Sequence, residues 1–138
     1  MSKIDFRNIE NLYEQPLPVI KKAVEGKWKL LSFVNNSEVG NFDDPLGTFM
    51  HINNNNIIIG DNTQEIIVES QIVWEKQKKF YNGKDVYVLK FNPTSVSFSI
   101  QGTTITKCML TFEIKNDTLS VWNCMMSNDA YFKFYKLN

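Results

Sequence analysis

The sequence predicts an all-β fold, an antiparallel up-and-down β-barrel of about eight to ten strands with a short N-terminal helix. Apolar residues recur at helical spacing only before residue 26. After that point, short segments that alternate apolar and polar residues are separated by turns rich in Gly, Asn and Pro. These turns are too short for the dozen or more residues that a parallel crossover requires, so we expect every strand pair to be antiparallel.

Length and charge limit the class of protein. A chain of 138 residues with 43% hydrophobic content can bury one core without disulfides or metals. We therefore expect an N-terminal helical segment over residues 1–25 and one barrel domain over residues 26–138. Fifteen basic residues balance fifteen acidic residues, so no net field attracts nucleic acid and we expect no such partner.

The apolar runs are all far shorter than the roughly 20 residues of a membrane-spanning helix, so no membrane span is expected. The first residues lack the apolar centre of a secretion signal. The sequence as it stands therefore predicts a cytoplasmic protein, or a secreted or periplasmic one if a leader was removed. No feature of the sequence indicates an oligomeric state.

The helical patterning lies in residues 1–25. Residues 8–13 predict one helical turn that Pro16 interrupts. Pro18 then suits the first turn of a helix through Glu25, and Gly26 ends that helix. We expect this helix to cover one end of the barrel.

The first strand begins at Gly26 and places Trp28, Leu30 and Val34 on one face. A tryptophan at the entrance of a closed barrel can plug that end and bury roughly 150–250 Å² of surface. The sequence Gly26-x-Trp28, preceded by a short helix, resembles the calycin superfamily, which includes the lipocalins and the fatty-acid-binding proteins. The resemblance implies that Trp28 closes the floor of the barrel.

Two departures refine this resemblance. Fatty-acid-binding proteins carry two helices after the first strand, and the polar loop at residues 35–45 is too short for them. Lipocalins often place an arginine of the last strand over the first-strand tryptophan, but the only arginine here is Arg7. The resemblance therefore implies a divergent lipocalin-like domain in which Lys133 or Lys136 takes the place of that arginine.

The remaining strands follow from alternation and turn residues. An asparagine run at residues 53–56 predicts a hairpin, and Asn82-Gly83 suits a two-residue type I′ turn. The turn at residues 115–118 predicts that Ile114 lies opposite Leu119. The expected strands are Leu46–Ile52, Asn56–Gly60, Ile66–Trp74, Val86–Phe91, Val96–Ile100, Thr104–Lys115, Leu119–Met125 and Ala130–Leu137.

Few side chains suggest chemistry. In the register expected for the hairpin around residues 115–118, Cys108 and Cys124 face opposite sides of the sheet, so we expect two free thiols. His51 is the only histidine; we expect an ordinary strand residue, with a haem or metal ligand as the alternative. Asp43, Asp44 and Asp61 are expected in solvated loops. We therefore expect no enzyme activity and no cofactor.

The last strand contains Lys133-x-Tyr135, where fatty-acid-binding proteins carry an inward Arg-x-Tyr that holds the ligand carboxylate. The resemblance implies the same role for these two residues. The alternative, which the alternation favours, places Phe132 and Phe134 inside and Lys133 outside.

The leading functional hypothesis is a non-catalytic, lipocalin-like protein that binds a small hydrophobic or amphipathic ligand inside the barrel. The alternative is a barrel filled by its own side chains, which would be a structural or interaction domain without a ligand. Besides Lys133 and Tyr135, the candidate ligand-binding residues are those expected on inward faces: Trp28, Leu30, Phe49, Ile66, Val68, Trp74, Phe98, Leu110, Phe112 and Val121.

Overall fold

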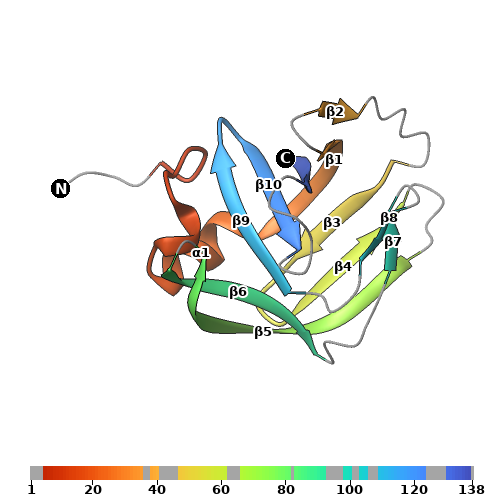
Figure 1. Ribbon diagram of the computed structural model, residues 1–138. Coiled ribbons are helices and arrows are strands. Elements are labelled where there is room, and N and C mark those ends of the chain that lie inside the picture. The colour runs from red at the N-terminus through yellow and green to blue at the C-terminus, as the bar shows by residue number, and fades with distance from the viewer. Residues whose placement is uncertain are drawn as a thin grey trace.

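The computed structural model describes residues 5–35, 38–40, 47–61, 66–81, 83–92, 98–100, 103–105, 109–123 and 130–137. Eight antiparallel strands form a closed up-and-down barrel in chain order, and the last strand pairs back onto the first (Figure 1). This confirms the predicted fold class. The barrel strands are β1 (Gly26–Asn35), β3 (Phe49–Ile52), β4 (Asn56–Gly60), β5 (Ile66–Tyr81), β6 (Lys84–Asn92), β9 (Met109–Lys115), β10 (Thr118–Asn123) and β11 (Ala130–Lys136).

Three short strands add to the barrel. β2 (Glu38–Gly40) pairs with the end of β1. β7 (Phe98–Ile100) and β8 (Thr103–Ile105) follow β6 in the chain, before β9, and form a separate two-stranded sheet. The strand expected over Thr104–Lys115 is thus divided between β8 and β9. Cys108 and Cys124 lie outside the described residues, so their free thiols stay a prediction.

One end of the barrel is covered by helix. The single 3-10 turn η1 (Leu12–Glu14) precedes α1 (Leu17–Val24), which has Pro18 in its first turn, as predicted. Ile20, Ala23 and Val24 of α1 are buried in the barrel core. In Figure 1, α1 lies at the left of the barrel, whereas β2 and the β7–β8 hairpin lie toward the right. No helix in the described part of the chain is long and apolar enough to cross a membrane.

Two hairpins match their predicted turns, whereas Asn82 of the predicted Asn82-Gly83 turn lies outside the described residues. Leu119 pairs with Ile114, and the two turn residues Asn116 and Asp117 have φ of 52° and 62°, as a type I′ turn requires. In the β3–β4 hairpin, the side chain of Asn53 accepts hydrogen bonds from the backbone N–H of Asn55 and of Asn56. The asparagine run is therefore a turn, as expected.

The register of the barrel strands shifts at three places: within β1, between β4 and β5, and between β5 and β6 after Gln77. In β1 the shift lies between Leu30 and Ser32, so that Phe33, not Val34, is paired with the buried Phe132. The side chain of Val34 lies outside the described part of the structure, so the expected face of Val34 stays a prediction. In β5 the register with β4 shifts beside Ile66.

The N-terminal segment completes the wall between β6 and β9. The described residues of these strands pair only at Leu89 with Leu110 and at Lys90 with Met109. Farther along β9, the N–H of Ile9 donates to the carbonyl of Ile114 at 3.3 Å. Ile9 and Leu12 are both buried in the core. Residues 7–12 therefore occupy the seam where β6 and β9 separate.

Candidate functional site

The floor of the barrel is built around Trp28. Its ring is 1% exposed, and its Nε1–H donates to the carbonyl of Val24 at 2.9 Å. Lys136 of the last strand places its Nζ 4.8 Å from the centre of the Trp28 ring and donates to the carbonyl of Glu25 at 2.6 Å. Lys136 thus takes the place expected for the lipocalin arginine, and one side chain joins α1, β1 and β11.

Gly26 allows this approach. A Cβ at this position would lie 2.8 Å from Nζ of Lys136 and 3.0 Å from its Cε. The backbone of Gly26 also has a φ of 125°, which residues other than glycine rarely adopt. The glycine of Gly26-x-Trp28 is therefore required by its backbone conformation, and a side chain there would also displace the flexible end of Lys136.

Most of the sequence-predicted ligand-binding residues do face the interior. The buried ones are Trp28, Leu30, Val68, Leu110, Phe112 and Val121. Trp74 is partly buried and packs with its ring centre 6.0 Å from that of Phe112. Phe98 belongs to β7, and its side chain lies outside the described part of the structure.

Four predicted residues do not face the interior. Phe49 pairs with Lys29 while Trp28 pairs with Met50, so Phe49 lies on the outer side, where Lys27 Nζ is 4.6 Å from its ring centre. Ile66 is 57% exposed, because the bulge in β5 reverses its face relative to Val68. Lys133 and Tyr135 lie outside because Phe132 and Phe134 occupy the interior of β11. This placement corrects the idea that they hold a ligand carboxylate inside the barrel.

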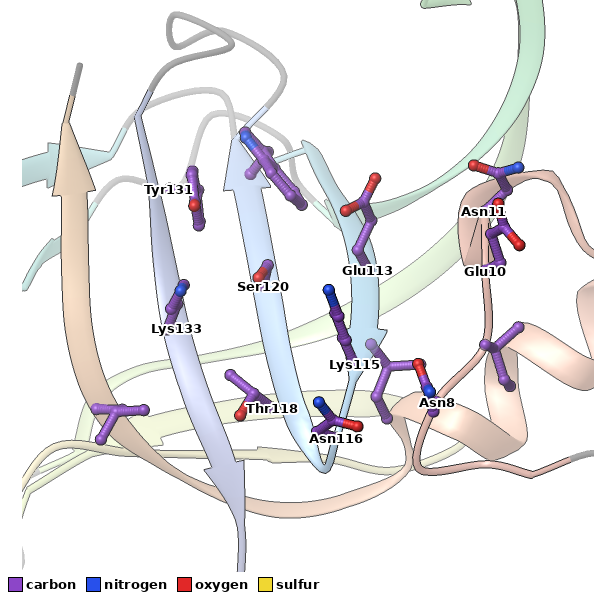
Figure 2. A pocket seen from close by; sticks show the side chains of 14 residues that line it. Asn8, Glu10, Asn11, Glu113, Lys115, Asn116, Thr118, Ser120, Tyr131 and Lys133 are labelled. Atoms are coloured by element: carbon purple, nitrogen blue, oxygen red, sulfur yellow. The ribbon is translucent and has the colours of Figure 1, made fainter. Parts of the chain in front are cut away.

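A second candidate site lies on the outer wall. A groove of about 830 Å³ runs between the outer faces of β9, β10 and β11 and the N-terminal segment (Figure 2). Its sheet side carries Glu113 and Lys115 from β9, Thr118 and Ser120 from β10, and Tyr131 and Lys133 from β11. Its other wall carries Asn8, Glu10 and Asn11.

Cross-strand pairing sets the geometry of the groove. Ser120 pairs with Glu113 on one side and with Lys133 on the other, which gives a row of carboxylate, hydroxyl and ammonium groups across three strands. Beside this row, the rings of Trp122 and Tyr131 have centres 4.6 Å apart and planes inclined by 33°. Nζ of Lys133 lies 6.0 Å from the Tyr131 ring centre. The small Ser120 side chain thus lies between charged neighbours and below an aromatic pair.

The groove is electrostatically mixed. The described residues that line it include two carboxylates, Glu10 and Glu113, and two ammonium groups, Lys115 and Lys133. Burial raises the pKa of the Glu113 carboxyl above its usual 4.5. The walls therefore exclude part of the water around Glu113, although its side chain keeps contact with solvent.

Sequence reasoning missed this groove. The outward residues of β10 and β11 could have been found from alternation, because they alternate along each strand with the predicted inward residues. The far wall could not, since the isolated bridge of Ile9 to Ile114 joins segments more than a hundred positions apart and leaves no periodic pattern.

Two expectations about single polar residues have different outcomes. Asp61, expected in a solvated loop, is buried with 6% exposure at the end of β4; Asp43 and Asp44 lie outside the described residues. His51 is partly buried on β3, between Lys27 and Ile58 of the neighbouring strands. No group of three or more His, Cys, Asp or Glu side chains suited to a metal occurs in the described ranges.

Comparison of the chain with protein-family models, with curated proteins and with solved structures finds no match.

Proposed function

We propose that this protein is a non-catalytic, lipocalin-like binding protein that holds a small hydrophobic or amphipathic ligand inside its barrel. The observation that carries the proposal is the sealed floor: Trp28 is buried against α1 and covered by Lys136. An eight-stranded barrel encloses an interior wide enough for one small ligand or for its own side chains. A barrel closed at one end by an apolar floor has the form of a binding cavity.

In this proposal the ligand contacts the inward face of β5. Phe112, which touches Trp74 near the floor, is 1% exposed, whereas the inward Val68 and Ile72 of β5 keep 8% and 9%. These two side chains are therefore the described interior positions best suited to contact a ligand. Their apolar character favours an alkyl chain or a ring system.

A filled barrel is the second candidate function. The near-complete burial of Leu110, Phe112 and Phe134 supports it, because these inward side chains occupy space in the barrel interior. Such a barrel would present its outer surface to a partner and bind nothing inside.

A fluorescence titration separates the two candidates. N-phenyl-1-naphthylamine, which emits strongly in apolar surroundings, is expected to bind the wild-type protein with a saturable increase in emission. Val68→Phe should weaken binding about tenfold by filling the interior. Val73→Phe on the same strand is the matched control, since Val73 is outward and 48% exposed, and it should bind like the wild type.

Native mass spectrometry of freshly purified protein provides the independent measurement. A co-purified small apolar molecule supports the binding protein. Absence of both a bound molecule and probe binding in a folded protein would establish the filled barrel instead.

A further inference from the structure

The outer groove has the chemistry of a binding site that is separate from the barrel interior. We propose that it binds a neutral oligosaccharide, with one sugar ring packed on the Trp122–Tyr131 pair and the hydroxyl groups bonded along the row Glu113, Ser120 and Lys133. The proposal does not depend on a ligand inside the barrel, because all these side chains face outward.

The aromatic pair supplies the packing surface. The faces of aromatic rings carry partial negative charge, and the C–H bonds of a sugar ring present weakly positive hydrogens to them. Trp122 and Tyr131 are each partly buried and stack on one another, with centres 4.6 Å apart and planes inclined by 33°. The sugar ring would pack on a ring face that is turned away from the other ring. Lys133 Nζ beside the Tyr131 ring extends this packing surface toward the polar row.

The polar row matches what sugar hydroxyls require. A hydroxyl group both donates and accepts hydrogen bonds; the Glu113 carboxylate only accepts, the Lys133 ammonium only donates, and the Ser120 hydroxyl does both. Adjacent strands are about 4.8 Å apart, so the row spans roughly 10 Å across β9, β10 and β11. Asn8 and Asn11 on the far wall add amides, which can donate and accept.

The balance of charge selects a neutral ligand. An anion attracted by Lys115 and Lys133 would be repelled by Glu10 and Glu113. A cation attracted by the two glutamates would be repelled by the two lysines. A peptide strand is disfavoured as well. β10, the middle strand on the sheet side of the groove, is already paired on both edges and offers no backbone groups for an added strand. The volume, about 830 Å³, lies within the usual range of small-molecule sites.

The test is an NMR titration of ¹⁵N-labelled protein with maltotriose, cellotriose and chitotriose, each to about 10 mM. At least one trisaccharide should produce saturable shifts of the Ser120 amide and the Trp122 indole N–H. Trp122→Ala should weaken that binding about tenfold, the effect of about 1.4 kcal/mol at an aromatic contact. Val73→Ala, an exposed apolar residue on β5, is the control and should leave binding unchanged.

Ser120→Val provides a second test if Trp122→Ala does not fold. Valine suits a strand and removes the central hydroxyl, so the protein should fold and bind the same trisaccharide more weakly. Saturable shifts with none of the three sugars would overturn the proposal. Unchanged binding by a folded variant, or shifts confined to Val68 and Ile72 inside the barrel, would also overturn it. Parallel titrations with tetralysine and tetra-aspartate peptides test charged ligands. Shifts with these peptides alone would contradict a neutral ligand.

Discussion

Replacing Lys136 by methionine tests the floor of the barrel. Methionine keeps most of the apolar length of the side chain but removes the ammonium over Trp28 and its hydrogen bond to the carbonyl of Glu25. A cation over an aromatic ring contributes about 0.5–2 kcal/mol depending on its burial. A hydrogen bond from a charged donor contributes about 1.5–3 kcal/mol when shielded, and less here because Lys136 is exposed as a whole.

The expected loss is therefore about 1–2 kcal/mol in the free energy of unfolding, with a fall in Tm of about 3–8 °C. Urea titration followed by tryptophan fluorescence and by far-UV circular dichroism measures it. Lys76→Met is the matched control, because Nζ of Lys76 lies 5.4 Å from the centre of the partly buried Tyr87 ring; it should cost less than about 0.5 kcal/mol.

A double-mutant cycle with Trp28→Phe isolates the contact between the two side chains. The two changes should be non-additive, because a smaller ring offers the ammonium less to cover. If Lys136→Met is no more destabilising than Lys76→Met, the cation over the indole does not contribute to stability.

Two further predictions concern the β9–β10 hairpin. Glu113→Gln should slightly raise the free energy of unfolding at pH 7: burial raises the folded-state pKa of this carboxyl, so its ionised form is disfavoured in the folded protein. The gain in the free energy of unfolding should shrink as the pH falls through that pKa and vanish below the ordinary pKa of 4.5. Urea titrations at pH 7 and pH 3.5 measure this gain. An equal gain at both pH values would contradict a raised pKa in the folded state. Asp117→Gly should raise stability by about 0.5 kcal/mol, because Asp117 has a φ of 62°, and Asp117→Val should lower it by about 1–2 kcal/mol; thermal unfolding that ranks valine above glycine would contradict the type I′ assignment.

Local signals in the sequence predict much of this fold. Turn residues and alternation are properties of adjacent residues, which is why the pairing of Ile114 with Leu119 was predicted correctly. Lys133 and Lys136 were the two lysines expected as candidates to cover Trp28, and the structure places Lys136 over its ring.

The failures have a common physical origin. A single bulged residue reverses every face that follows it, and no residue type marks the bulges near Leu31 and Ile67. Ile66 was therefore assigned to the wrong face even though its strand was predicted correctly. The groove was missed because one of its walls depends on Ile9 reaching β9, a tertiary contact rather than a local one.

The pairing of β1 with β11 has a consequence for biosynthesis. Trp28 and Lys136 belong to strands that are adjacent in the barrel although more than a hundred positions separate them in the chain. Trp28 therefore leaves the ribosome long before Lys136 is synthesised, and the nascent sheet has an unpaired edge until β11 emerges. Such non-local closure slows folding and exposes apolar surface to neighbouring chains, so the yield of folded protein in cells should depend on chaperones that hold the unfinished barrel.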